Sequence, residues 1–80
     1  MRKLPLCQVE DDELERLLLQ YKSTSKQDAE LEVTLYKKIR YEGFSTMEIA
    51  RDEHLSRPSV YRKIKKVDQY IERMTKKNNG

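Results

Sequence analysis

The side chains with the clearest chemistry in this sequence are five cations that lie within ten residues and have no acid between them. Guanidinium and ammonium groups bind phosphate, and an arginine fork also pairs with the edge of guanine. Residues 33–80 contain twelve Lys and Arg against six Asp and Glu, whereas residues 1–32 contain five against eight. This asymmetry favours a polyanionic partner, with a solvated helix face as the alternative. The five cations are Arg57, Arg62, Lys63, Lys65 and Lys66.

Residues typical of catalysis or metal binding are not grouped in this chain. His54 is the only histidine and Cys7 the only cysteine, so the chain has no Cys/His cluster with zinc spacing, and no pattern in the sequence groups His54 with a Ser and an Asp as a triad. The acids of residues 10–13 are adjacent rather than paired across a site, and the two glycines cannot form a phosphate-binding loop. We therefore expect a protein that is not an enzyme and has no metal or cofactor.

Length and composition favour one small helical domain. The chain has 80 residues, of which 36% are apolar and 39% charged, and its net charge is +3. It contains no apolar run of about 18 residues and no secretory leader, which predicts a cytoplasmic protein that does not cross a membrane.

The cations must be positioned by helices, and apolar periodicity predicts where these lie. Residues 1–8 are expected to form a flexible arm and residues 9–21 an acidic helix with one apolar stripe. A second helix is expected over residues 26–42, capped by Ser25 or Thr24 and stopped by Gly43 in a left-handed conformation. The stripe of the acidic helix contains Leu14, Leu17, Leu18 and Tyr21.

Residues 45–66 have the pattern of two short helices joined by a tight turn. Ser45 and Glu48 form a capping box, while Ser56 caps the next helix and Pro58 occupies its first turn. Ala50 is expected where the two helices cross closely, because only a small side chain fits there.

Segment 43–64, GFSTMEIARDEHLSRPSVYRKI, resembles the bacterial helix-turn-helix pattern S/T-x-x-E-I-A-x-x-L-G-V-S-x-x-T-V-x-R-x-L. It departs from the pattern at Glu53, where an apolar residue is usual, and at His54, which replaces the turn glycine and is expected to take a positive φ. The segment is also similar to region 4 of bacterial sigma factors and to the ArpU-type regulators of phages and mobile elements. These resemblances imply a four-helix, all-α domain that reads DNA with the second helix of the motif.

The resemblance assigns a role to nine side chains. Base edges are expected to contact Arg57, Ser59, Tyr61 and Arg62. For Tyr61 the expected contact is a thymine methyl group or a phosphate, with packing against the second helix as the alternative. Phosphates are expected to contact Thr46, Arg51, Lys63, Lys65 and Lys66, although Thr46 is equally well explained as a helix cap. A further basic cluster, Lys37, Lys38 and Arg40, is interpreted as a solvated face.

Residues 67–80 are expected to extend the last helix and to end in a frayed tail. A heptad seam along this helix predicts either intramolecular packing or a homodimer. The seam consists of Val60, Ile64, Val67, Ile71 and Met74.

The sequence thus predicts sequence-specific binding of double-stranded DNA, by a transcriptional regulator of a phage, plasmid or other mobile element. Two alternatives stay open. One is an adaptor that contacts RNA polymerase through the acidic face of residues 10–15, and the other is an accessory DNA-binding protein for packaging or recombination.

Overall fold

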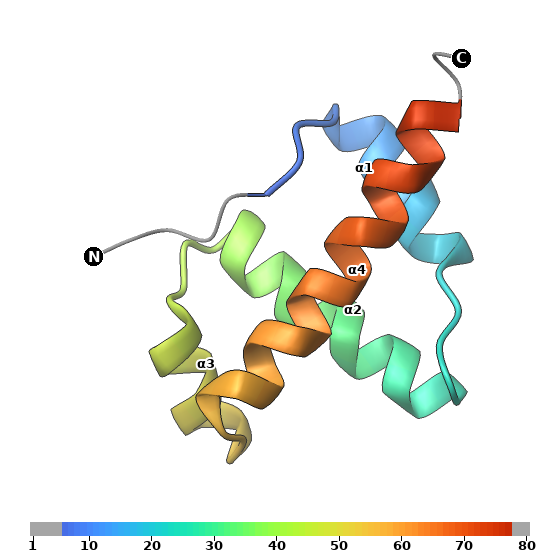
Figure 1. The fold of residues 1–80 in the computed structure, drawn as a ribbon. Helices are drawn as coiled ribbons and strands as arrows, with labels where there is room; N and C mark the ends of the chain where they lie inside the picture. The colour runs from blue at the N-terminus through green and yellow to red at the C-terminus, as the bar shows by residue number, and fades with distance from the viewer. Residues whose placement is uncertain (1–5, 78–80) are drawn as a thin grey trace.

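The computed structural model describes residues 6–77, which form four helices and, over that range, no strand. The helices are α1 (Asp11–Gln20), α2 (Lys26–Arg40), α3 (Thr46–Glu53) and α4 (Arg57–Lys77). Figure 1 shows α4 crossing α2, with α3 beside the first turns of α4 and α1 beside its second half. The predicted all-α fold with a long last helix is confirmed.

Helix ends follow local signals in the sequence. The Ser25 hydroxyl caps α2 by accepting from the Asp28 amide at 3.1 Å. At the start of α3, the Ser45 hydroxyl accepts from the Glu48 amide and the Glu48 carboxylate accepts from the Ser45 amide, so the capping box is complete. Gly43 follows α2 at φ +74°, a conformation that glycine adopts without steric cost.

Two helices differ from their expected bounds, and the first of them ends one residue early, at Gln20. The first helix begins at Asp11 rather than at residue 9, because Glu10 is extended and its side chain makes no capping bond. The second helix ends at Arg40, and residues 41–42 form a turn that leads into Gly43. These differences lie within the usual uncertainty of helix ends.

The heptad seam of α4 is filled by this chain. Val60, Ile64, Val67 and Ile71 are all 0% exposed, and Met74 is half-buried. They pack mainly against α2, with α3 and α1 completing the contact. The seam is therefore an intramolecular core, and a homodimer through these four side chains would have to displace α2. Other members of the core are Leu14, Leu17, Leu18, Tyr21, Leu35, Tyr36, Ile49 and Ala50.

Asp68 is a buried carboxylate that ties three segments together. It accepts from the Cys7 amide at 2.9 Å and from the Tyr36 hydroxyl at 3.1 Å. Arg40 closes the cluster by donating to the carbonyls of Cys7 and Val9, at 2.9 and 2.7 Å. A cation and an anion thus share one buried network, which offsets the desolvation of both charges.

Within the segment expected as a flexible arm, residues 1–8, Leu6 and Cys7 pack against the fold, while residues 1–5 lie outside the described range. The Cys7 backbone is held at both its amide and its carbonyl, and Leu6 and Cys7 are half-buried. The same contacts correct the interpretation of Arg40 as part of a solvated face. Of the tail, residues 76 and 77 are still helical, and residues 78–80 are not described.

Replacing Asp68 with Ala should lower the free energy of unfolding by about 1–3 kcal/mol, because it leaves the Tyr36 hydroxyl and the Cys7 amide without their acceptor. Urea denaturation followed by circular dichroism measures the change. Gln69→Ala is the matched control: Gln69 is the next residue of α4 and is exposed, so we expect a change within about 0.5 kcal/mol. Equal effects of the two variants would contradict the role of Asp68.

Cys7 should react slowly with iodoacetamide in the folded chain. Burial, together with a hydrogen bond to Asp68 and its negative charge, raises the pKa of the Cys7 thiol from 9.0 to about 11. At pH 8 the reactive thiolate is then about a hundredfold scarcer than in the unfolded chain. Alkylation rates with and without urea, read by mass spectrometry, test this. Equal rates in both conditions would contradict it.

Candidate nucleic-acid interface

The turn between α3 and α4 is set by a histidine in the left-handed region. His54 has φ 57° and ψ 42°, which confirms the positive φ expected where the pattern has glycine. The amides of His54 and Leu55 both donate to the Ala50 carbonyl, the latter at 2.9 Å. These two bonds end α3 within one residue and turn the chain sharply.

The start of α4 is fixed by its cap and by a small residue on α3. The Ser56 hydroxyl accepts from the Ser59 amide at 3.3 Å, and Pro58 lies in the first turn, as predicted. Ala50 is 8% exposed and belongs to the same core as Val60, so α3 lies close to α4. The turn, the cap and the core together give α4 a defined direction relative to α3.

Three of the four expected base contacts are exposed to solvent. Arg57 and Arg62 are exposed, and Tyr61 is 45% exposed. Within residues 6–77 neither arginine forms an ion pair or a side-chain hydrogen bond, so both guanidinium groups are free for a ligand. α1 packs on the second half of α4, where Tyr70 bonds the Leu17 carbonyl, and leaves this surface uncovered.

Ser59 differs from the other three. It is half-buried, and its hydroxyl accepts a hydrogen bond from the Ser56 hydroxyl at 2.9 Å. The geometry assigns Ser59 to the cap of α4, and its expected contact with a base would require this bond to be exchanged.

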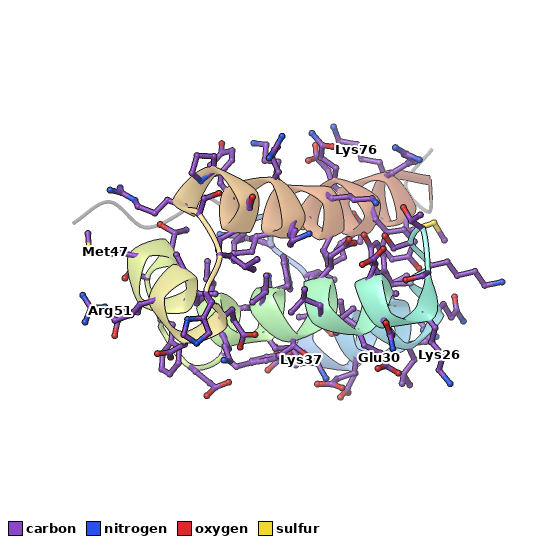
Figure 2. All side chains as sticks on the ribbon, turned by 90° about the horizontal axis from the view of Figure 1, so that it is seen from below. Lys26, Glu30, Lys37, Met47, Arg51 and Lys76 are labelled. Carbon is purple, nitrogen blue, oxygen red and sulfur yellow. The ribbon has the colours of Figure 1, made fainter. Side chains whose placement is uncertain are left out.

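The expected phosphate contacts lie on both helices of the motif. Arg51 is exposed on α3, and Figure 2 shows it pointing away from the helices on the same side as Met47. Thr46 is half-buried in the first turn of α3. Lys63 and Lys65 are half-buried on α4, and the Lys65 ammonium lies 5.9 Å from the centre of the Tyr61 ring.

Lys66 is engaged within the fold. Its ammonium donates to the Ser23 hydroxyl at 2.9 Å and lies 3.9 Å from the Glu32 carboxylate, which is buried and also bonds the Tyr21 hydroxyl. Lys66 thus links α4 to the segment between α1 and α2. Its side chain is still 50% exposed, so a phosphate contact would be shared with this internal one.

Two members of the basic cluster on α2, Lys38 and Arg40, make contacts within the fold rather than forming a solvated face. The Lys38 ammonium donates to the Glu53 carboxylate at 3.0 Å and lies 5.9 Å from the centre of the Phe44 ring. The hydrogen bond to Glu53 raises the pKa of Lys38 above its usual value. Glu53, one of the two departures from the family pattern, therefore anchors the end of α3 to α2. Lys37 is the most exposed of the three and makes a long ion pair of 3.9 Å with Glu15.

A groove of about 1110 Å³ runs beside Arg57 and Tyr61. One wall is the segment of residues 6–9, and the other is formed by the end of α2 and the starts of α3 and α4. No local pattern in the sequence predicts this wall of residues 6–9, because the contacts that hold it join positions 31 to 61 residues apart. A smaller hollow of about 420 Å³ adjoins the groove, and it is lined by Thr46, Arg57, Pro58 and Tyr61.

Residues 6–77 contain no group of three or more His, Cys, Asp or Glu side chains arranged to hold a metal ion. In the same range, no helix is both long and apolar enough to span a bilayer. Comparison of the chain with protein-family models, with curated proteins and with solved structures finds no match.

The free energy of unfolding of His54 variants should depend on whether the new residue tolerates the left-handed conformation of the turn. Glycine accepts φ 57° without strain, so His54→Gly should keep or raise the free energy of unfolding. His54→Val should lower it by about 1–2 kcal/mol, because a β-branched side chain is strained there. The midpoints of urea unfolding test this. If the valine variant is as stable as the glycine variant, the turn does not have this conformation.

Proposed function

We propose that this protein binds double-stranded DNA in a sequence-specific way, with the first half of α4 in the major groove. The observation that carries the proposal is the pair of exposed, unpaired arginines of α4: Arg57 is the first residue of the helix, and Arg62 lies on the side opposite its buried stripe. A major groove is wide enough for one α-helix, and its guanines offer two acceptors to an arginine fork.

The surroundings of α4 support this docking. The first turn of α4 has no acid, so its backbone amides favour an anion such as a phosphate. Arg51 on α3 extends the positive surface across the turn, where it can reach the DNA backbone. The chain's most acidic segment, residues 10–15, belongs to the start of α1, and α1 packs at the other half of α4.

The cellular role that we propose is regulation of transcription in a phage, plasmid or other mobile element. It is supported by the resemblance of residues 43–64 to sigma region 4 and to the ArpU-type regulators, and RNA polymerase is the protein partner that this resemblance implies. Binding in packaging or recombination would use the same surface. Selecting bound duplexes from a random pool would give the recognised sequence and its symmetry.

Arg62→Ala should reduce discrimination at one base pair of the selected site by about 1–3 kcal/mol, since it removes the donor fork from that step. Arg51→Ala should instead weaken all duplexes about equally and reduce the slope of log K against log salt by about one unit. Fluorescence anisotropy over a range of salt concentrations, with the selected duplex and single-base variants, separates the two effects.

Arg73→Ala is the matched control, because Arg73 is an exposed arginine on α4 that lies three turns beyond Arg62. It changes the net charge equally and should leave discrimination at every base pair unchanged. If the three variants behave alike, α4 does not read the groove. If the unaltered chain binds no duplex even at low salt, the protein does not bind DNA.

A further inference from the structure

The hollow beside Arg57 combines one strong donor with uncharged walls. Its lining consists of Arg57, Pro58 and Tyr61 from the first turns of α4, and Thr46 from the first turn of α3. Because Tyr61 follows Arg57 by four residues, both lie on the side of α4 that faces the start of α3. Tyr61 is 45% exposed, so its ring is available to a ligand rather than packed on α2.

Each wall of the hollow supplies a different chemical group. Pro58 contributes a pyrrolidine ring and no amide hydrogen, and Tyr61 contributes an aromatic ring. The guanidinium of Arg57 donates only, and the hydroxyls of Thr46 and Tyr61 both donate and accept. The hollow therefore suits a group that has an apolar protrusion next to a hydrogen-bond acceptor.

Among the four bases, thymine alone presents this combination in the major groove. It carries a C5 methyl group beside the O4 acceptor, whereas cytosine presents an amino donor and no methyl group. A cytosine amino group would point its hydrogens toward the donors of Arg57. Guanine satisfies the arginine but leaves the apolar walls without a partner.

We propose that this hollow holds the methyl group of a thymine whose O4 accepts from Arg57, and so makes the protein select a T·A pair at that step. The proposal rests on the proposed function, since it names the base that this part of the interface recognises. Tyr61 is the specificity-determining residue, because its ring is the largest apolar surface in the hollow.

Replacing thymidine with deoxyuridine tests the proposal, because it removes only the methyl group. In the selected duplex, each thymidine is replaced in turn and the affinity is measured by anisotropy. We expect one position at which the change weakens binding about fourfold, as for one buried methyl group. With Tyr61→Ala, that position should bind thymidine and deoxyuridine equally well, whereas Tyr61→Phe should keep the difference.

Gln69→Ala serves as the matched control, because Gln69 is exposed on α4 beyond the hollow, and it should keep the full deoxyuridine effect. Urea unfolding of Tyr61→Ala confirms that the variant is folded. If the chain binds the duplex but no deoxyuridine weakens binding, the hollow does not read a methyl group and the proposed function stands. If Tyr61→Ala keeps the difference, another residue reads it. If no duplex is bound at all, both proposals fail.

Discussion

The complete burial of one side of α4 is the constraint on which the rest of this structure depends. Four aliphatic residues of α4 are fully enclosed, at a spacing that keeps them on one stripe of the helix. At about 25 cal/mol for each Å² of apolar surface, this stripe is a main source of stability in so short a chain. It also fixes the rotation of α4 about its axis, so that Arg62 faces solvent, whereas Arg57 is in line with the stripe and is exposed at the start of the helix, ahead of the first buried residue.

Two buried carboxylates hold the remaining segments onto this helix. The Asp68 carboxylate accepts a hydrogen bond from the Cys7 amide. The Glu32 carboxylate accepts from the hydroxyls of Tyr21 and Ser23. Within residues 6–77 no buried side-chain polar atom lacks a hydrogen-bond partner, so the cost of burying these charges is offset by their bonds. Such networks favour one arrangement of α1 and α2 over others that the apolar stripe alone would allow.

The features that could be predicted from the sequence are local ones. Helix caps and stops depend on a few neighbouring residues, so a local sequence pattern predicts them. They are the caps at Ser25, Ser45 and Ser56, the stop at Gly43 and the left-handed turn at His54. The exposure of Arg62 followed from the apolar period of α4, which is equally local, whereas Arg57 continues the spacing of the stripe and is exposed because it begins the helix.

The long-range polar contacts could not be predicted in the same way. Arg40 and Lys66 look like surface cations in the sequence, because their partners lie 31 to 43 residues away. Asp68 belongs to a polar stretch between the seam residues Val67 and Ile71. No local pattern indicates that its carboxylate accepts a hydrogen bond from the Cys7 amide. Glu53 departs from the helix-turn-helix pattern, which has an apolar residue at this position. Its ion pair with Lys38 holds the end of α3 against α2, as an apolar residue would do by packing.

Different residues of α4 contribute to stability and to the proposed DNA binding, so substitutions along the helix have different effects. Its buried stripe and Asp68 act on stability, and its first two exposed turns present the groups proposed to act on DNA. Lys66 belongs to both, because its ammonium bonds Ser23 and remains half exposed. A loss of DNA affinity on changing Lys66 would therefore combine a missing phosphate contact with a shifted α1–α2 segment. The exposed Arg51, which has no partner within residues 6–77, is free of this ambiguity.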